Sequence, residues 1–335
     1  MKLIYRSASE EEIKEDRFST EEFNIHEKKD GKESIIRVEL IEAYREFYNF
    51  KDEPFAITPD PKFFYFSNSH SEALNHLRYG IYEGMGFTLI SGEPGTGKTI
   101  LSRYFIEKSG NDLKIIRIFD PRISANEIIN NLLGYSTEHY SKSEVTSDAE
   151  LLERLAQMLL NFYRDQKRVV VLVDEAQTLG DETLEGLRLL SNLETQRDKL
   201  LHIVLFTQPE LEERLKKRGL RQLDQRILVR YNLLPFEPEE IKLYIKSQLS
   251  IAAGDPEICF TSEAIKSIYR LSSGIPRLVN ALCERALMSA FVDNLKTIQE
   301  SHVLEGSESL KRLIPCENRL LSRIETLKRT NSEKI

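Results

Sequence analysis

The chain has 335 residues, of which 40% are hydrophobic and 30% charged, a composition that supports a packed core and excludes disorder of the whole chain. Its net charge of −7 repels phosphate backbones on average, which disfavours extensive coating of nucleic acid. The three cysteines, Cys259, Cys283 and Cys316, form no C-x-x-C pair, which disfavours a zinc site and a disulfide framework and fits a reducing compartment.

Residues 1–43 are dense in charged side chains and are interpreted as an N-terminal extension. No apolar run approaches the roughly 20 residues that a membrane helix requires, and the N-terminus has no apolar signal-peptide region. The sequence therefore predicts a cytoplasmic protein that would reach the inner membrane only through a partner.

A core domain is predicted over residues 44–235. It begins with an aromatic, proline-rich strap, residues 44–66, after which short apolar runs alternate with helical patterns. Such alternation predicts an α/β fold with a parallel sheet covered on both faces. The expected strands are 87–91, 114–119, 169–173, 201–206 and 229–233, and the expected helices are 71–83, 98–109, 151–162 and 184–193. The polar run 134–147 is expected to be a long loop.

A second, smaller domain, residues 236–303, is predicted to be purely helical, with helices at 238–252, 262–271 and 276–291. Residues 304–335 are expected to form a polar tail. Within this tail, the amphipathic stretch 320–327 fits either a capping helix or a short coiled-coil contact.

A phosphate-binding loop is predicted from Gly92 to Thr99, which match G-x-x-x-x-G-K-[ST] between an expected strand and an expected helix. Its glycines allow backbone N–H groups to point at phosphates, and the following helix N-terminus adds a favourable field. Lys98 is expected to reach the β- and γ-phosphates, and the Thr99 hydroxyl to ligate Mg²⁺. The sequence thus predicts ATP and Mg²⁺ as cofactors. The expected nucleotide contacts are Gly92, Glu93, Pro94, Gly95, Thr96, Gly97, Lys98, Thr99 and Ile100.

Two carboxylates, Asp174 and Glu175, follow the apolar strand 169–173. Ligands of open α/β sheets bind at this carboxyl edge. Asp174 is expected to hold Mg²⁺ through water, and Glu175 to orient or deprotonate the attacking water. A glycosidase pair of carboxylates is the alternative, but no sugar-binding aromatics occur at matching positions.

These motifs resemble those of the AAA+ ATPases, and within them the ExeA/GspA group of secretion-associated ATPases. The resemblance covers roughly residues 44–302. It depends most on D-E-A-Q at 174–177 and L-L-S-N-L-E-T at 189–195. It implies a P-loop core with a five-stranded parallel sheet in the order 5-1-4-3-2 and a C-terminal helical lid.

The resemblance also implies further catalytic roles. Thr207 and Gln208 match sensor 1, and Arg277 matches sensor 2. Arg226 matches the arginine finger that acts on a neighbouring subunit, and Arg221 and Arg230 are alternatives for this role. A homo-oligomer is implied by such a finger. The histidines His70 and His76 are expected to be a strap contact and a surface residue rather than metal ligands.

The function favoured by the resemblance is a Mg²⁺-dependent ATPase that assembles or remodels a protein complex of secretion or the cell envelope. Secretion members continue into a membrane span and a peptidoglycan-binding domain, whereas this chain ends in a polar tail, so the ATPase chemistry carries over more firmly than the secretion role. Two alternatives remain open: an ATP-dependent DNA-binding regulator and a slow nucleotide-switch scaffold. The basic stretch 214–221 fits either a solvated helix end or a phosphate contact.

Overall fold

The computed structural model of the chain describes residues 41–118, 124–136, 147–253 and 257–312. The chain divides into two compact units, residues 1–43 and 44–335, and every contact below lies within the second. The amphipathic stretch 320–327 and Cys316 lie outside the described residues. None of the helices within the described residues is both long enough and apolar enough to span a membrane.

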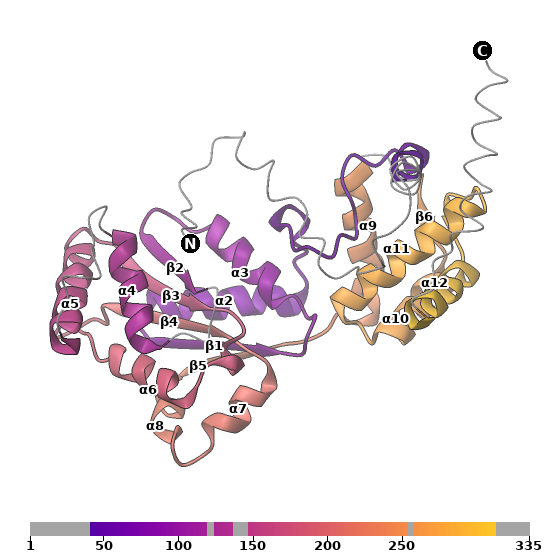
Figure 1. Ribbon diagram of the computed structural model, residues 1–335. Coiled ribbons are helices and arrows are strands. Elements are labelled where there is room, and N and C mark those ends of the chain that lie inside the picture. The colour runs from indigo at the N-terminus through magenta and orange to yellow at the C-terminus, as the bar shows by residue number, and fades with distance from the viewer. Residues whose placement is uncertain (1–40, 119–123, 137–146, 254–256, 313–335) are drawn as a thin grey trace, which may run out of the picture. The chain divides into compact units, whose positions relative to one another are not determined.

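The core contains a five-stranded parallel sheet (Figure 1). Its strands follow the expected ranges closely: β1 (Phe87–Gly92), β2 (Leu113–Ile118), β3 (Arg168–Val173), β4 (Leu201–Phe206) and β5 (Val229–Leu233). The order is β2-β3-β4-β1-β5, which confirms the order that the resemblance implied.

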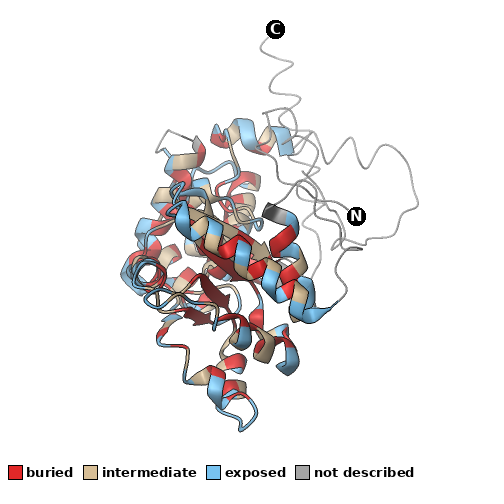
Figure 2. Ribbon diagram, turned by 90° about the vertical axis from the view of Figure 1, so that its left-hand side faces the viewer, coloured by how far each residue is buried: buried red, intermediate tan, exposed pale blue. Residues whose placement is uncertain are grey.

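Apolar helices cover both faces of this sheet because alternate residues of one strand point to opposite sides. In β4, Leu201, Ile203 and Leu205 join one core cluster, whereas Val204 and Phe206 join another. The first cluster contains residues of α4 (Ala125–Ser136), α5 (Asp148–Arg164), α6 (Asp181–Leu190), α7 (Pro209–Leu215) and α8 (Arg221–Asp224), and the second contains residues of α2 (Asn68–Tyr82) and α3 (Lys98–Glu107). Figure 2 shows the resulting pattern, with buried residues along the strands and on one side of the helices.

The expected helices differ from the observed ones mainly at their ends. Helix α2 begins at Asn68, three residues early, because the Ser67 side chain caps it by accepting a hydrogen bond from the His70 N–H. The expected loop 134–147 was wrong at its start, since α4 continues to Ser136. Residues 137–146 lie outside the described part.

The region predicted as a second domain, called the second domain below, is mainly helical and consists of α9 (Pro238–Ala253), α10 (Ser262–Ser272), α11 (Pro276–Val292) and α12 (Glu300–Arg312). The expectation that it is purely helical was wrong, because β6 (Cys259–Phe260) and β7 (Thr297–Ile298) form a small parallel sheet. Two-residue strands are too short to give a periodic sequence signal. The boundary expected between residues 303 and 304 falls inside α12, which packs on α11. Gly306 allows this close approach, since a Cβ there would lie 2.8 Å from Arg285 Cβ.

The strap, residues 44–66, contacts both domains through its backbone and includes the 3-10 helix η2 (Pro61–Phe63). Three of its carbonyl oxygens accept hydrogen bonds from side chains of α3, α9 and α11. These are Pro59 O from Arg103 Nη1 at 2.6 Å, Phe63 O from Gln248 Nε2 at 3.0 Å and Ala56 O from Asn280 Nδ2 at 3.4 Å.

We expect Glu284 of α11 to make the stability of the fold depend on pH. Its carboxylate accepts a hydrogen bond from the Tyr44 hydroxyl at 3.4 Å, and burial raises its pKa to about 7. Because this folded-state pKa lies above the usual value, the folded state binds the proton more tightly than the unfolded state, and stability is lost as the pH rises from about 4.5 to about 7.

We therefore expect Glu284→Gln to raise the free energy of unfolding at pH 8 by about 1–3 kcal/mol and to change it much less at pH 5. Thermal unfolding at the two pH values measures this difference. Glu308→Gln, at an exposed position of α12, is the matched control. An equal effect of Glu284→Gln at both pH values would contradict the expectation.

Candidate active site

The predicted phosphate loop joins β1 to α3, and its shape requires glycine at two positions. Gly95 and Gly97 have φ values of 84° and 101°, in the left-handed region that side chains disfavour. Space is equally limited: a Cβ at Gly95 would lie 3.0 Å from Arg277 Cβ, and one at Gly97 would lie 2.6 Å from His70 Nε2. The loop is therefore packed against both the second domain and α2.

Lys98 begins α3 and turns its ammonium back onto the loop. The Nζ atom donates hydrogen bonds to the carbonyl oxygens of Gly92 at 2.7 Å and Glu93 at 3.0 Å. Burial lowers the pKa of Lys98, and the nearby carboxylates of Glu175 and Asp174 oppose this shift. A positive charge is thus held inside the loop, where a phosphate would meet it.

Asp174 and Glu175 follow β3 directly, as expected from the sequence. Asp174 Oδ2 accepts a hydrogen bond from Arg117 Nη2 at 3.0 Å, with both side chains largely buried. The backbone N–H of Glu175 donates to Asp174 Oδ1 at 3.1 Å. The Asp174 carboxylate and the Thr99 hydroxyl are hard oxygen donors, the type that Mg²⁺ prefers, so these residues fit the predicted metal. Arg117 was missed because its place beside Asp174 depends on the pairing of β2 with β3.

Gln177 links the predicted sensor-1 residues to the predicted catalytic base. Its Oε1 accepts hydrogen bonds from Thr207 Oγ1 at 3.3 Å and from the Gln208 N–H at 3.1 Å, and its Nε2 donates to the Glu175 carboxylate. Gln208 Nε2 also donates to Glu175 Oε2, at 3.2 Å. Two amides therefore hold the carboxylate of Glu175, and Gln177 joins the ends of β3 and β4.

Arg214 of α7 fixes the short helix η4 (Ala176–Thr178) that carries Gln177. It donates to the carbonyl oxygens of Gln177 at 2.6 Å and Leu179 at 2.9 Å, and it pairs with Asp181 at 2.6 Å. Within the basic stretch 214–221, this residue is therefore committed to contacts inside the fold rather than to an external phosphate.

Residues of both the core and the second domain line one cleft of about 540 Å³. Lys98, Glu175 and Gln208 line it from the core, and Arg277 lines it from the start of α11. The Arg277 N–H donates to the Gly95 carbonyl at 3.2 Å, so α11 is tied directly to the phosphate loop. The cleft is also lined by residues that the sequence analysis did not assign to the site: Glu53, Pro54, strap residues 56–60, Tyr244, Gln248 and Asn280.

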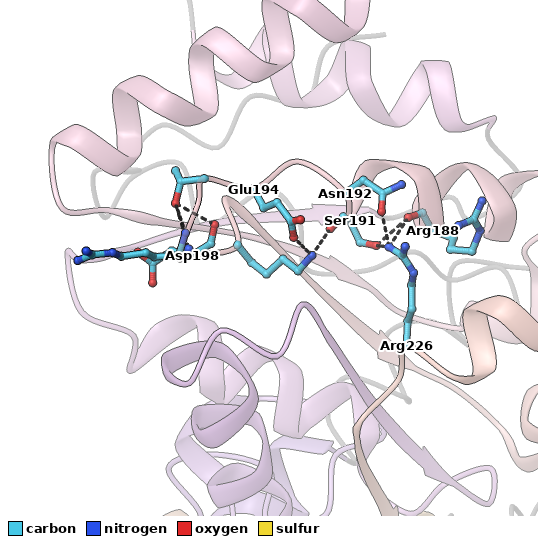
Figure 3. A network of polar contacts seen from close by, with 9 residues as sticks. Arg188, Ser191, Asn192, Glu194, Asp198 and Arg226 are labelled. Atoms are coloured by element: carbon cyan, nitrogen blue, oxygen red, sulfur yellow. Dashed lines mark hydrogen bonds and ion pairs between the residues drawn. The ribbon is translucent and has the colours of Figure 1, made fainter.

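The three arginines considered as the arginine finger for a neighbouring subunit have different surroundings. Arg226 Nη1 donates to Ser191 Oγ at 2.9 Å and to Asn192 Oδ1 at 2.6 Å (Figure 3). Arg230 pairs with Asp224 at 2.8 Å. Arg221 is exposed, and no partner for its side chain is found within the described residues.

Comparison with known proteins identifies the fold and its family. Residues 81–215 match the family described as AAA domain. The chain is also 42% identical over 256 residues to General secretion pathway protein A of Aeromonas hydrophila, an alignment that covers 74% of this chain and 45% of that protein. The chain belongs to the AAA+ ATPases. The resemblance to the ExeA/GspA group is thereby confirmed, although this AAA+ chain spans less than half the length of that relative.

Solved structures agree with this assignment at the level of the fold. The ORC2 protein of Aeropyrum pernix, in ADPNP–ADP complexes, matches with a TM-score of 0.58 and 16% identity, covering 77% of this chain and 71% of that one. The CDC6P protein of Pyrobaculum aerophilum matches with a TM-score of 0.54 and 16% identity, covering 79% and 70%. At such identities the likeness concerns the fold alone.

Proposed function

We propose that this AAA+ protein binds ATP with Mg²⁺ and hydrolyses it to ADP and phosphate. The observation that carries the proposal is the convergence of Lys98, Glu175, Gln208 and Arg277 on one cleft. These residues come from four separate parts of the chain, and each has the chemistry that phosphoryl transfer to water requires.

Each residue has a distinct part in the proposed reaction. Lys98 and the loop N–H groups bind the phosphates. Thr99 and Asp174 would hold Mg²⁺, which neutralises phosphate charge when bound. Glu175 accepts a proton from the attacking water, and the amide of Gln208, which contacts Glu175 at 3.2 Å, helps to place that water. Arg277 brings a second cation from the α11 side of the cleft.

We expect Lys98→Ala to weaken the binding of a fluorescent ATP analogue by about 10- to 100-fold, because one charge-assisted contact contributes about 1.5–3 kcal/mol. Equilibrium titration with Mg²⁺ present measures the dissociation constant. Lys108→Ala is the matched control, since Lys108 caps the other end of the same helix and pairs with Glu107 at the surface. Unchanged affinity of Lys98→Ala would remove the phosphate-loop assignment.

We further propose that the protein acts as a homo-oligomer with Arg226 as the arginine finger, and that Arg221 and Arg230 are the alternatives. The existing contacts of Arg226 lie at the C-terminal end of α6, so the side chain would exchange them for a neighbour's phosphate on assembly. Arg221 would need no such exchange. Substitution of each arginine in turn distinguishes them, as argued in the Discussion.

The biological role is proposed to be ATP-driven assembly or remodelling of a protein complex, in the cytoplasm and near the inner membrane through a partner. The support is the similarity to General secretion pathway protein A. The DNA-binding alternative is disfavoured by the net charge of −7 and by the internal contacts of Arg214. A gel shift on duplex DNA that weakens steeply with salt would reverse this preference.

A further inference from the structure

His70, in the first turn of α2, lies directly beneath the phosphate loop. Its side chain is only 3% exposed, and its Nδ1 lies 2.7 Å from Ser67 Oγ. A Cβ placed on Gly97 would lie 2.6 Å from its Nε2. The sequence analysis expected a strap contact here. The ring does lie against Phe64 of the strap, with centroids 5.6 Å apart, but its nitrogens connect Ser67 to the loop.

The protonation state of His70 defines what each nitrogen does. Burial lowers its pKa to about 4, so the ring is neutral near pH 7 and has one donor and one acceptor nitrogen. The ring Nε2 lies next to the Thr96–Gly97 peptide, and a contact with the backbone of Thr96 opposes the lowering of the His70 pKa. The Thr96 N–H already donates to Glu93 O, so the Thr96 carbonyl is the group left to accept. We assign the tautomer in which Nε2–H donates to this carbonyl and Nδ1 accepts from the Ser67 hydroxyl.

This contact has a consequence for the loop because a trans peptide is planar, with its C=O and N–H pointing in opposite directions. A donor that holds the Thr96 carbonyl toward α2 turns the Gly97 N–H away from α2 and toward the cleft, which Gly97 lines. Gly97 has no side chain and adopts a left-handed φ of 101°. The orientation of the Thr96–Gly97 peptide is therefore determined by the groups that contact it.

We propose that His70 is a positioning residue for nucleotide binding: it orients the Thr96–Gly97 peptide so that the Gly97 N–H is ready to donate to a phosphate. This inference rests on the proposed ATP-binding function. It makes the loop pre-organised before the nucleotide arrives, so that binding does not have to include the cost of ordering this peptide.

A second side of the His70 ring packs against Phe236, which lies between β5 and α9 at the start of the second domain. The centroids of His70 and Phe236 are 5.9 Å apart. The Phe236 N–H donates to the Gly274 carbonyl at 2.9 Å, and Gly274 lies two residues before the start of α11, the helix of Arg277. The imidazole is thus fixed between the strap and the start of the second domain, and its Nε2 remains aimed at the loop.

The test compares substitutions that keep or remove the donor at the position of Nε2. The side-chain amide nitrogen of glutamine reaches about as far as Nε2, whereas asparagine reaches only as far as Nδ1. Titrations of fluorescent ADP and ATP analogues are expected to give His70→Gln a dissociation constant close to that of the unmodified protein. His70→Asn and His70→Phe are expected to bind both nucleotides about tenfold more weakly, the change that corresponds to one hydrogen bond.

Two further readouts separate positioning from general stability. Turnover at saturating ATP should change less than KM in His70→Asn, because the Gly97 N–H is not a catalytic group. The thermal midpoint without nucleotide should not follow the order of the affinities. His76→Phe is the control, since His76 lies on the same helix but is only half-buried, and its Nδ1 donates to Glu72 O in its own helix.

Equal affinities of His70→Gln and His70→Asn would overturn the inference, and this comparison remains informative if His70→Phe does not fold. Failure of the inference is distinct from failure of the proposed function. If Lys98→Ala loses nucleotide binding while all three His70 variants retain it, ATP binding stands and only the role of His70 falls.

Discussion

ATP hydrolysis by Arg226→Ala is expected to fall by about 10³-fold or more, with ATP affinity nearly unchanged. The reason is that an arginine finger acts on the transition-state charge in a neighbouring subunit and contributes about 10³–10⁵ in turnover in strong cases. Specific ATPase activity of the unmodified protein should therefore rise with protein concentration. Steady-state phosphate release over a range of concentrations measures both effects.

The trans arrangement is tested by mixing Arg226→Ala with Glu175→Gln. At an interface where the first protein binds ATP and the second provides the finger, both Glu175 and Arg226 are present, so activity should partly return. A purely internal role of Arg226, through its contacts with Ser191 and Asn192, predicts no such return. Absence of rescue in a mixture shown to co-assemble would move the role to Arg221 or Arg230. Turnover independent of protein concentration would exclude trans action.

Glu175→Gln alone is expected to bind ATP normally and to hydrolyse it roughly 10²-fold more slowly or worse, the usual scale for the loss of a general base. Glutamine keeps the shape of the side chain but cannot accept the proton. Asp174, the proposed Mg²⁺ ligand, remains. Single-turnover phosphate release and nucleotide titration measure the two properties separately.

Glu182→Gln, an exposed substitution in the first turn of α6, is the control for Glu175→Gln. A parallel fall of binding and hydrolysis in Glu175→Gln would assign Glu175 to the metal or to the fold instead of to proton transfer. That result would leave the phosphate loop as the nucleotide site without its proposed base.

The sequence predicted the strands well because their apolar runs are local features, and it placed the proposed phosphate loop between β1 and α3 for the same reason. The run Val169 to Val173 is apolar throughout, which is typical of a strand buried on both faces, and the loop motif is contiguous. The strand order came from the resemblance, because periodicity does not specify which strands pair.

The contacts around the site depend on residues that are distant in the sequence, and they were not predicted. Arg117 meets Asp174 only because β2 pairs with β3. Gln177 contacts Thr207 across two strand ends, and His70 reaches the loop through the packing of α2. A single sequence contains no local pattern for such pairs, so the environment of each predicted catalytic residue had to come from the structure.

The strap forms part of the wall of the cleft, and part of its course does not depend on its own side chains. Its three contacts described above are accepted by backbone carbonyls, which every amino acid possesses, whereas the donors are the side chains of Arg103, Gln248 and Asn280. The course of the strap therefore depends on donors outside it as well as on its own buried aromatic side chains, such as Phe55 and Phe64. Ile57, which is 72% exposed, can be replaced without disturbing these contacts. Substitution of such exposed side chains along this wall of the cleft is therefore expected to alter ligand preference, while the donors keep these three carbonyls in place.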